Sequence, residues 1–322
     1  MIEIRNLVKY YGDKKAVDDI TFTVNDGEIL GFLGPNGAGK TTTMNILTGF
    51  LSATSGKVSI NGFDILESPQ EAKRNIGYLP EHPPLYLDMT VTEYLRFVSE
   101  LKGVDPAVRT RQLTDIMRSV RITDHAGRLI KNLSKGYRQR VGIAQAMVGN
   151  PSVLILDEPT VGLDPKQIIE IRNLIKELGK KHTVILSSHI LPEVQAVCER
   201  VVIINRGRIA AVDTPISLSA RMNKVSRLQL TVEGPHKEVI QKLRTIPGLK
   251  KAELYLEKEG GGACVVNVES ETGMDVRRPL FFEMARNSWP IMELRSLDPT
   301  LEDIFLAVTS GAVTVEEQEE GA

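Results

Sequence analysis

The sequence predicts an α/β domain with a mixed sheet and a helical subdomain, followed by a small α+β domain. Three observations support this fold class: nearly continuous apolar segments, helical stretches between them, and a change of pattern near residue 220. Apolar runs without alternation are typical of parallel strands that are covered on both faces. We therefore place the first domain at 1–220, its helical subdomain at about 85–150, and the second domain, with an acidic tail, at 221–322.

The first domain is expected to contain strands of two kinds. "IEIRNLV" and "ITFTVN" alternate as half-exposed strands do, whereas "EILGFLG", "VLILD" and "TVILSS" are typical of buried central strands. Helices are predicted at 40–49, 91–103, 106–122, 136–149 and 165–180. Another helix should begin after Ser68, because Pro69 suits the first helical position and Glu71 would complete a capping box.

The second domain has a regular order of expected elements. They are a strand in "SRLQLTVEG", a helix in "HKEVIQKLRTI", a hairpin of "KAELYLEKE" and "ACVVNVES" across "GGG", a helix in "MDVRRPLFFEMARNS" and a strand in "IMELRSL". This β-α-β-β-α-β order is the ferredoxin-like arrangement. A last helix is predicted at 300–309, with Thr300 and Asp303 in capping-box positions.

The composition excludes several classes of function. The chain has 322 residues, 42% hydrophobic and 25% charged, and a net charge of −1, which gives no electrostatic basis for binding nucleic acid or an anionic membrane. Cys198 and Cys264 lack CxxC-type spacing, so we expect idle thiols in a reducing compartment. We find no signal peptide and no apolar run of the ~18 residues that a membrane helix needs. A role at a membrane would require a partner.

A phosphate-binding loop (P-loop) follows the strand "EILGFLG". "GPNGAGKTT" fits G-x-x-x-x-G-K-[ST] between a strand and a helix, a context that argues against a glycine-rich turn without a ligand. Lys40 should reach the β- and γ-phosphates, Thr41 should coordinate Mg²⁺, and Thr42 should contact the α-phosphate. The glycines let backbone N–H groups point at phosphate oxygens. The predicted loop contacts are Gly34, Pro35, Asn36, Gly37, Ala38, Gly39, Lys40, Thr41 and Thr42.

Two further strand ends carry groups suited to nucleotide hydrolysis. "VLILDEPT" ends in Asp157, which can hold Mg²⁺, and Glu158, which can orient and deprotonate an attacking water. The alternative is a pair of solvated acids at a strand exit. His189 ends the strand "TVILSS", where a γ-phosphate contact is favoured over a packed structural histidine.

These motifs, in this order, resemble the nucleotide-binding subunit of ATP-binding-cassette (ABC) transporters over residues 1 to about 215. "LSKGYRQR" resembles the signature motif of that family, usually LSGGQ, with Lys135 and Tyr137 as departures. In the family two subunits pack head to tail. The resemblance therefore implies that Ser134 and Gly136 bind the γ-phosphate of the ATP held by the partner, and that Asp164 of "GLDP" crosses the dimer interface.

The same resemblance assigns two more positions. Tyr11 in "YYG" resembles the aromatic residue that stacks on adenine, with Tyr10 as the alternative. After "IGYLP" the family usually has glutamine, and this chain has Glu81. A carboxylate there can accept a hydrogen bond from the attacking water or lie near Mg²⁺, and it adds negative charge near the γ-phosphate. Glu81 thus joins the candidate catalytic residues, Glu158 and His189, and the candidate metal ligands, Thr41 and Asp157.

"YLPEHPPLYLDMTVTEYL" and "LDPTLEDIFLAVT" resemble exporter ATPases of the ABC-2 type, a group that serves gliding motility, copper-enzyme maturation and drug or polysaccharide export. The resemblance implies an ATPase that uses ATP and Mg²⁺, dimerises on ATP, and powers a separately encoded transmembrane permease from the cytoplasmic face of the membrane. Segment 82–92 would face the coupling helix of the permease, unless it makes ordinary loop packing. Its apolar residues are Leu85, Tyr86, Leu87 and Met89.

Other functions stay open as alternatives. A soluble ABC ATPase that acts on nucleic acid or ribosomes usually has two cassettes or coiled-coil inserts, and this sequence shows one cassette and no heptad run. A P-loop kinase or GTPase would leave the tyrosine, signature and histidine set unexplained. The partner ATPase is expected to be a second copy of this chain, with a paralogue as the alternative. For the second domain we favour a dimer contact over a ligand sensor or a permease dock.

Overall fold

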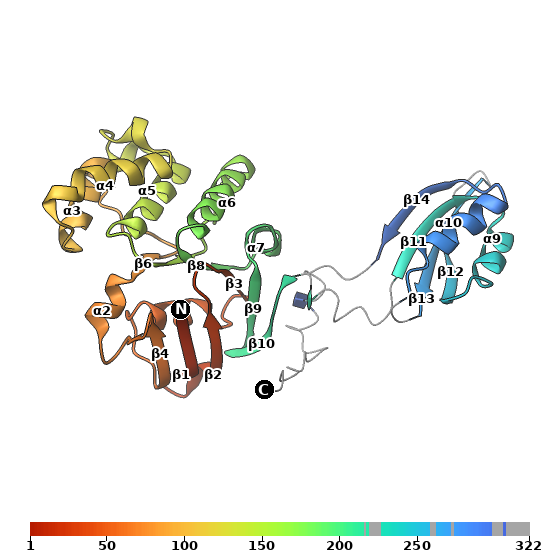
Figure 1. Ribbon diagram of the computed structural model, residues 1–322, viewed down its shortest axis with the longest axis horizontal. Helices are drawn as coiled ribbons and strands as arrows, with labels where there is room; N and C mark the ends of the chain where they lie inside the picture. Colours follow the sequence, from red (N-terminus) through yellow and green to blue (C-terminus); the bar gives the residue numbers. More distant parts are fainter. Residues whose placement is uncertain (216, 219–226, 258–261, 272–273, 298–304, 307–322) are drawn as a thin grey trace. The chain divides into compact units, whose positions relative to one another are not determined.

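The computed structural model describes all of the chain except residues 216, 219–226, 258–261, 272–273, 298–304 and 307–322 (Figure 1). The chain forms two compact units, one of residues 1–215 with the segment from Phe305 onwards, and one of residues 216–304. The predicted boundary at 220 assigned Phe305 and Leu306 to the second domain instead. Most of the predicted helix at 300–309, including Thr300 and Asp303, lies outside the described residues; Phe305 and Leu306 are helical.

The larger sheet of the first unit has, in the described part, six strands in the order β10-β9-β3-β8-β7-β6. All residues of three neighbouring strands, β3, β8 and β7, are buried, as their continuous apolar sequences predict. Five strands are parallel and β10 pairs antiparallel with β9. The strands are β3 (Ile29–Leu33), β6 (Ile76–Leu79), β7 (Val153–Asp157), β8 (Thr183–Ser188), β9 (Arg200–Asn205) and β10 (Arg208–Asp213).

A second, antiparallel sheet and one helix cover one face of the larger sheet. Its strands are β1 (Ile2–Tyr11), β2 (Lys14–Val24), β4 (Ser55–Ile60) and β5 (Phe63–Asp64), in the order β2-β1-β4-β5, and the helix is α1 (Lys40–Leu47). Side chains of both sheets and of α1 form one core. The rings of Phe22 and Phe32 meet in this core at 5.5 Å. Because this core joins α1 to both sheets, it fixes the start of α1 at the edge of the larger sheet.

Helices lie on the other face of the larger sheet (Figure 1). They are α5 (Lys135–Met147), α6 (Pro165–Gly179) and α7 (Leu191–Val197). Between β6 and α5 the chain also forms α3 (Val91–Leu101), α4 (Pro106–Ser119) and the 3₁₀ turns Thr123–His125 and Ile130–Asn132. The five predicted helices are present and end one to three residues earlier than expected. In the described chain, no helix combines the length and the apolar character that crossing a membrane requires.

The capping box predicted at Ser68 does not form. Helix α2 (Pro69–Arg74) begins where expected, but the Ser68 side chain makes no capping hydrogen bond to it, because the ψ of Ser68, 60°, departs from the extended conformation that capping residues adopt. A complete capping box instead starts α3. The N–H of Glu93 donates to Thr90 Oγ1 at 3.3 Å, and the N–H of Thr90 donates to Glu93 Oε2 at 2.8 Å.

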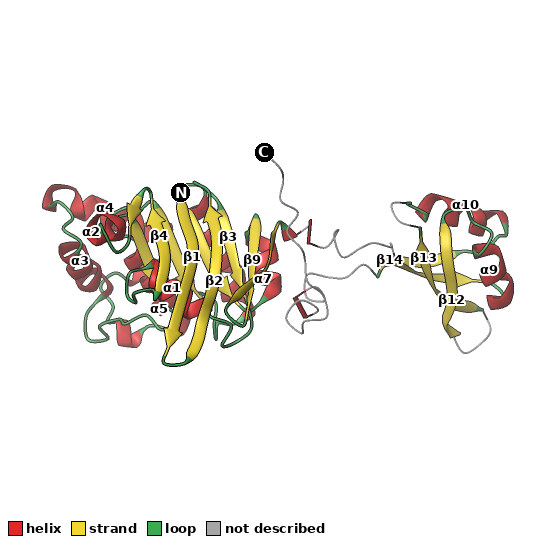
Figure 2. Ribbon diagram, turned by 90° about the horizontal axis from the view of Figure 1, so that it is seen from below, coloured by secondary structure: helices red, strands yellow, loops and turns green. Residues whose placement is uncertain are grey.

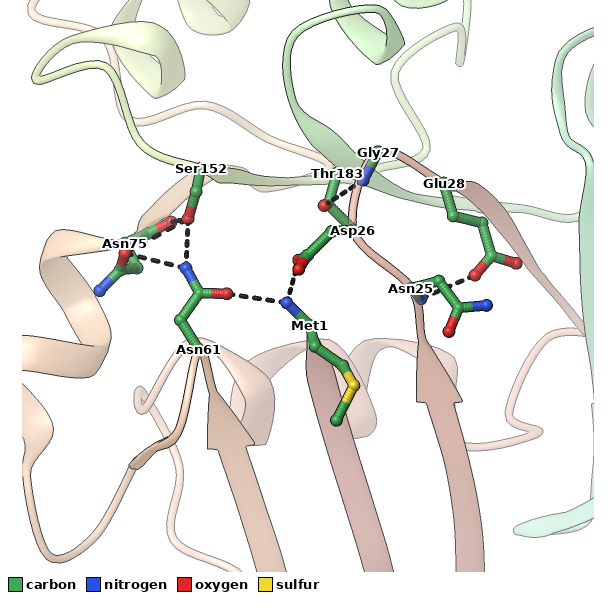
Figure 3. Close-up of polar contacts among 9 residues, drawn as sticks. All are labelled: Met1, Asn25, Asp26, Gly27, Glu28, Asn61, Asn75, Ser152 and Thr183. Carbon is green, nitrogen blue, oxygen red and sulfur yellow. Dashed lines mark hydrogen bonds and ion pairs between the residues drawn. The ribbon is translucent and has the colours of Figure 1, made fainter.

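Polar contacts join the two sheets at one end of the first unit (Figure 3). The Met1 nitrogen donates to Asn61 Oδ1 at 2.8 Å, and Asn61 Nδ2 donates to Ser152 Oγ at 2.7 Å. The N–H of Gly27 donates to Thr183 Oγ1 at 2.9 Å. Ser152 and Thr183 lie at the amino ends of β7 and β8, so these contacts leave the carboxyl ends of the strands for another use.

The second unit has the predicted β-α-β-β-α-β order. Its elements are β11 (Arg227–Glu233), α9 (His236–Leu243), β12 (Leu249–Glu257), β13 (Ala263–Ser270), α10 (Arg277–Arg286) and β14 (Ile291–Ser296). The strands pair antiparallel in the order β12-β13-β11-β14, and α9 and α10 lie on one side of this sheet (Figure 2). Leu230, Val266 and Leu280 are fully buried between the sheet and the helices. The unit therefore has a hydrophobic core of its own.

Candidate functional site

A cavity of about 540 Å³ lies where the parallel strands of the larger sheet end. Leu33, the last residue of β3, pairs with Ser188 of β8, and Asp157 of β7 pairs with Ser187. The loops after these strands therefore leave the sheet at one edge, the usual place for a ligand in an α/β sheet. The cavity is lined by the predicted residues Tyr11, Pro35, Asn36, Gly37, Gly39, Lys40, Thr41, Thr42, Glu81, Glu158 and His189, and by Lys14, Lys15, Ala16, Val161 and Arg206.

The phosphate loop has the backbone geometry that an anion cradle requires. Gly37 has φ +78°, and no atom lies within 4 Å of the position that a Cβ would take there. Gly39 has φ +110°, and a Cβ would stand 2.6 Å from the carbonyl oxygen of Ala16, so only glycine fits this position. Helix α1 starts at the next residue, Lys40. The loop thus leads the chain from β3 into a helix whose positive end faces the cavity.

Lys40 lies inside the loop and is only 6% exposed. Its Nζ donates to the carbonyl oxygen of Gly34 at 2.7 Å and lies 3.8 Å from Glu158 Oε1. Burial lowers the pKa of Lys40, and nearby carboxylates partly offset this effect. A mostly buried cation at the N-terminus of a helix is well placed to bind an anion. Gly34 and Ala38 are the two predicted loop residues off the cavity wall; Ala38 packs into the core.

Asp157 lies fully buried at the end of β7, and neither carboxylate oxygen has a hydrogen-bond partner in the described part of the chain. Burial raises the pKa of Asp157. The nearby Ser187 hydroxyl partly offsets this effect, and the negative charges of Glu158 and Glu81 add to it. A buried carboxylate without a partner is unfavourable by itself and fits a cation. With the Thr41 hydroxyl on the cavity wall, it supplies the oxygen ligands that Mg²⁺ prefers.

Glu158 and His189 meet on the cavity wall. The Nδ1 of His189 lies 2.9 Å from each carboxylate oxygen of Glu158. Glu158 has φ +49°, and its N–H donates to the carbonyl oxygen of Ser187 at 2.9 Å. Strained backbone of this kind in a non-glycine residue is concentrated at functional sites. The loop after β7 therefore turns the Glu158 carboxylate toward both the imidazole and the Lys40 ammonium.

Tyr11 and Tyr10 differ in position although both are partly exposed. Tyr11, 49% exposed, lines the cavity, whereas Tyr10, 41% exposed, does not, and its ring lies 5.3 Å from the Lys15 ammonium. Lys14 and Arg206 also line the cavity, and no motif in the sequence selects them. A basic residue at the start of a strand or in a turn is a common surface feature, so only the fold shows that these cations face the phosphate loop.

The residues of the signature motif and of "GLDP" lie elsewhere, at the starts of α5 and α6. Ser134 caps α5, accepting a hydrogen bond from the N–H of Tyr137 at 3.4 Å, and Asp164 caps α6, accepting from the N–H of Gln167 at 2.9 Å. Gly136 packs so closely on Gln167 that a Cβ would stand 2.5 Å from its Nε2. The cavity wall includes neither cap nor Gly136. The chain thus carries two separate groups of predicted site residues.

The two departures from the signature motif make contacts of their own. The Lys135 ammonium lies over Gly162, where a Cβ would stand only 2.0 Å from Nζ. The ring of Tyr137 stacks on His125 with centroids 4.1 Å apart. Lys135 therefore joins the signature turn to the "GLDP" turn, and Tyr137 joins it to the 3₁₀ turn at Thr123–His125.

Comparison with known proteins gives consistent results along the chain. Residues 17–161 match the family described as "ABC transporter". The chain is 31% identical over 311 residues to the linearmycin resistance ATP-binding protein LnrL of Bacillus subtilis, covering 96% of this chain and 98% of the relative. It is 32% identical to the bacitracin transport ATP-binding protein BcrA of Bacillus licheniformis, covering 97% and 98%.

Solved structures match about two thirds of the chain. One, described as the structure of an ATP-binding subunit of an ABC transporter, has a TM-score of 0.63 at 32% identity and covers 69% of this chain and 92% of the other. Another, described as the dimeric structure of MJ0796, a bacterial ABC transporter cassette, has a TM-score of 0.60 at 25% identity and covers 66% and 98%.

Proposed function

Because this chain belongs to the ATP-binding subunits of ABC transporters, we propose how its two groups of site residues work together. As an ABC ATPase it hydrolyses ATP. The cavity holds Mg-ATP, two copies close head to tail so that the signature residues of each copy cover the nucleotide of the other, and closure drives a separate membrane permease. The relatives named for resistance to linearmycin and transport of bacitracin favour an exporter.

One observation carries this proposal. Lys40, Glu158 and His189 share a cavity wall, whereas Ser134 and Asp164 lie at helix starts outside it. Side chains that cap the starts of helices accompany backbone N–H groups suited to an anion. Since the cavity of the same chain does not include them, a second molecule is the natural source of the phosphate that they would bind.

Within the cavity each residue has a specific task. Tyr11 stacks on the adenine, the loop N–H groups and Lys40 bind the phosphates, and Thr42 contacts the α-phosphate. Thr41 and Asp157 hold Mg²⁺, with Glu81 near them. The ion supplies positive charge that neutralises the phosphate oxygens during the reaction. Lys14 and Arg206 add positive charge at the cavity wall.

The contacts of Glu158 suggest how hydrolysis is restricted to the filled site. Its carboxylate lies 2.9 Å from His189 Nδ1 and 3.8 Å from Lys40 Nζ, the same two groups that would bind the γ-phosphate. An arriving γ-phosphate competes for both. Glu158 is then free to accept the proton of a water molecule as the water oxygen bonds to phosphorus and the bond from phosphorus to ADP breaks.

A groove of about 670 Å³ fits the permease. Its wall includes Phe50, which is 82% exposed, together with His82 and Pro84 of the segment predicted to face the membrane subunit. A large exposed apolar side chain on the wall of a groove can be buried by a partner that fills the groove. Tyr86 of the same segment is only half-exposed, because its ring packs on the ring of Phe97 with the two centroids 5.3 Å apart. We assign the groove to a cytoplasmic helix of the permease, which would hold the chain at the inner face of the membrane.

Gel filtration of Glu158→Gln tests the head-to-tail site. Removal of the proposed base should trap the closed state, so the variant should shift from monomer to dimer only when Mg-ATP is added. The double variant Lys40→Met/Glu158→Gln is the control, because it should bind little ATP and stay monomeric. A Glu158→Gln chain that binds Mg-ATP and hydrolyses it at the wild-type rate would contradict the role of Glu158.

Membrane sedimentation tests the groove in cells that produce the whole transporter. Phe50→Asp should reduce the fraction of the chain that sediments with membranes, since it places a charge in the apolar contact. Phe63→Asp is the matched control, because Phe63 is also exposed but lies on β5, away from the groove. Equal sedimentation of the two variants would argue against the groove as the permease contact.

A further inference from the structure

A second hydrogen bond, fully inside the protein, joins the two loops that carry Glu158 and His189. Thr160 Oγ1 donates to Glu193 Oε2. Thr160 follows Glu158 by two residues in the loop after β7, and Glu193 follows His189 by four residues, in the first turn of α7. The Thr160 and Glu193 residues are only 2% and 4% exposed. The two loops are therefore linked twice, once on the cavity wall and once beneath it.

Glu193 is an unusual choice for a purely structural position. Its second carboxylate oxygen, Oε1, has no hydrogen-bond partner within the described chain. Burial raises the pKa of Glu193, which reflects the cost of placing a charge there. A leucine or methionine would fill such a position without this cost. The carboxylate therefore calls for a role beyond packing.

The middle and the first turn of α7 are held by different parts of the protein. Val194, in the middle of the helix, packs against Gly31 of β3 so closely that a Cβ on Gly31 would stand 2.4 Å from the Val194 side chain. The first turn contacts the loop after β7 through Thr160 and Glu193. Since His189 lies two residues before this helix, the position of the imidazole depends on how the first turn of α7 is held.

We propose that Glu193 is a positioning residue for ATP hydrolysis. Through Thr160 it keeps the loop of Glu158 in register with the segment of His189. The link between Glu158 and His189 on the cavity wall must exchange its partners when a γ-phosphate and a water molecule enter. The buried link between Thr160 and Glu193 stays closed and preserves the spacing of the two loops. Glu193 touches neither nucleotide nor water, and its role rests on the proposed roles of Glu158 and His189.

Three single substitutions separate positioning from packing. Thr160→Val keeps the shape of the side chain and removes the hydroxyl donor, and Glu193→Leu removes the acceptor. Glu193→Gln keeps an oxygen that can accept the Thr160 hydrogen bond. We expect kcat for ATP hydrolysis to fall roughly ten- to a hundredfold in Thr160→Val and Glu193→Leu, because small misplacements of catalytic groups have effects of this size. Glu193→Gln should stay within about threefold of the wild type, since the acceptor remains.

Separate measurement of kcat and KM distinguishes a positioning role from a role in nucleotide binding. KM for ATP should change by less than about threefold in all three variants, since no nucleotide contact is lost. Thermal unfolding curves of each full-length variant establish that the assay temperature lies below the transition. The double variant Thr160→Val/Glu193→Leu should be no slower than the slower single variant, because both changes break the same link.

Two results would overturn the inference. One is a folded Thr160→Val chain with kcat within twofold of the wild type. The other is a double variant whose loss is the product of the two single losses. Either result would leave Glu158→Gln inactive, so failure of the positioning role is distinguishable from failure of the proposed base.

Discussion

The two groups of site residues in the first unit differ in how their side chains are used. In the phosphate-loop cluster, Lys40, Glu158 and His189 contact one another around a cavity. In the signature cluster, the polar side chains of Ser134 and Asp164 each cap a helix, and neither residue lines the cavity. The first cluster can act on a ligand as it stands. In the proposed function, the second would supply donors to a ligand that another molecule brings.

This difference also separates binding from turnover. Loss of a phosphate-loop residue should affect the binding of ATP by a single chain, because the cavity belongs to that chain. Loss of a signature residue should leave binding intact and reduce hydrolysis, which requires the closed pair. Each prediction below tests one side of this comparison.

The largest effect is expected from Lys40→Met. The variant loses the buried cation of the phosphate loop, so ATP affinity and ATPase activity should each fall by more than about a hundredfold. Equilibrium binding of a fluorescent ATP analogue and a phosphate-release assay measure the two quantities. If this variant bound ATP with normal affinity, the phosphate-loop cluster would not be the ATP-binding site, and the distinction between the two clusters would fail.

Ser134→Arg should reduce hydrolysis by about tenfold or more and leave ATP affinity within about threefold, because the bulky cation blocks only the partner's nucleotide. A mixture of equal amounts of Ser134→Arg and Lys40→Met provides the sharpest test. Random pairing should restore about a quarter of the wild-type sites, since half of the dimers would carry one intact composite site. No recovery in the mixture, with dimers confirmed by light scattering, would contradict a site shared between chains.

Tyr11→Ala should raise KM for ATP by about tenfold, the size expected for loss of one aromatic stack on a base. Tyr10→Ala is the matched control, because Tyr10 is similarly exposed but lies off the cavity wall. The KM of this variant for ATP should change by less than about twofold. The opposite order of effects would assign the adenine to Tyr10.

The smallest effect is expected from Glu81→Gln, which restores the residue usual in the family. The amide keeps an oxygen acceptor and removes a negative charge from the cavity, so ATPase activity should stay within about tenfold of the wild type. Steady-state ATPase rates over a range of Mg²⁺ concentrations measure the change. An inactive variant would show that the carboxylate itself is required, and that Glu81 is an essential residue of the phosphate-loop cluster.

Short-range signals predicted much of the fold. The continuous apolar segments gave β3, β7 and β8 correctly, and the motif around Lys40 gave the turn into α1, because each depends on neighbouring residues only. The capping box at Ser68 failed because the backbone there takes a conformation that the four-residue pattern does not encode.

Long-range contacts account for what sequence reasoning missed at the site. Thr160 and Glu193 lie 33 residues apart and meet only because β7 and β8 are adjacent in the sheet. Lys14 reaches the cavity from the start of β2, and Arg206 reaches it from the turn after β9. The acidic residue in "LPEVQ" is the single signal that could have drawn attention to Glu193, and a charge in the first turn of a helix is ordinarily explained by the helix dipole.

The contact of Lys135 with Gly162 has a consequence for cooperativity. It places the Lys135 ammonium of the signature turn against the "GLDP" turn of the same chain, so we expect the two turns to approach a partner together. Engagement with a partner's ATP would then be all-or-none rather than stepwise. The rate of hydrolysis should depend on ATP concentration with a Hill coefficient above one, and Lys135→Gly, which frees the two turns from each other, should bring it closer to one.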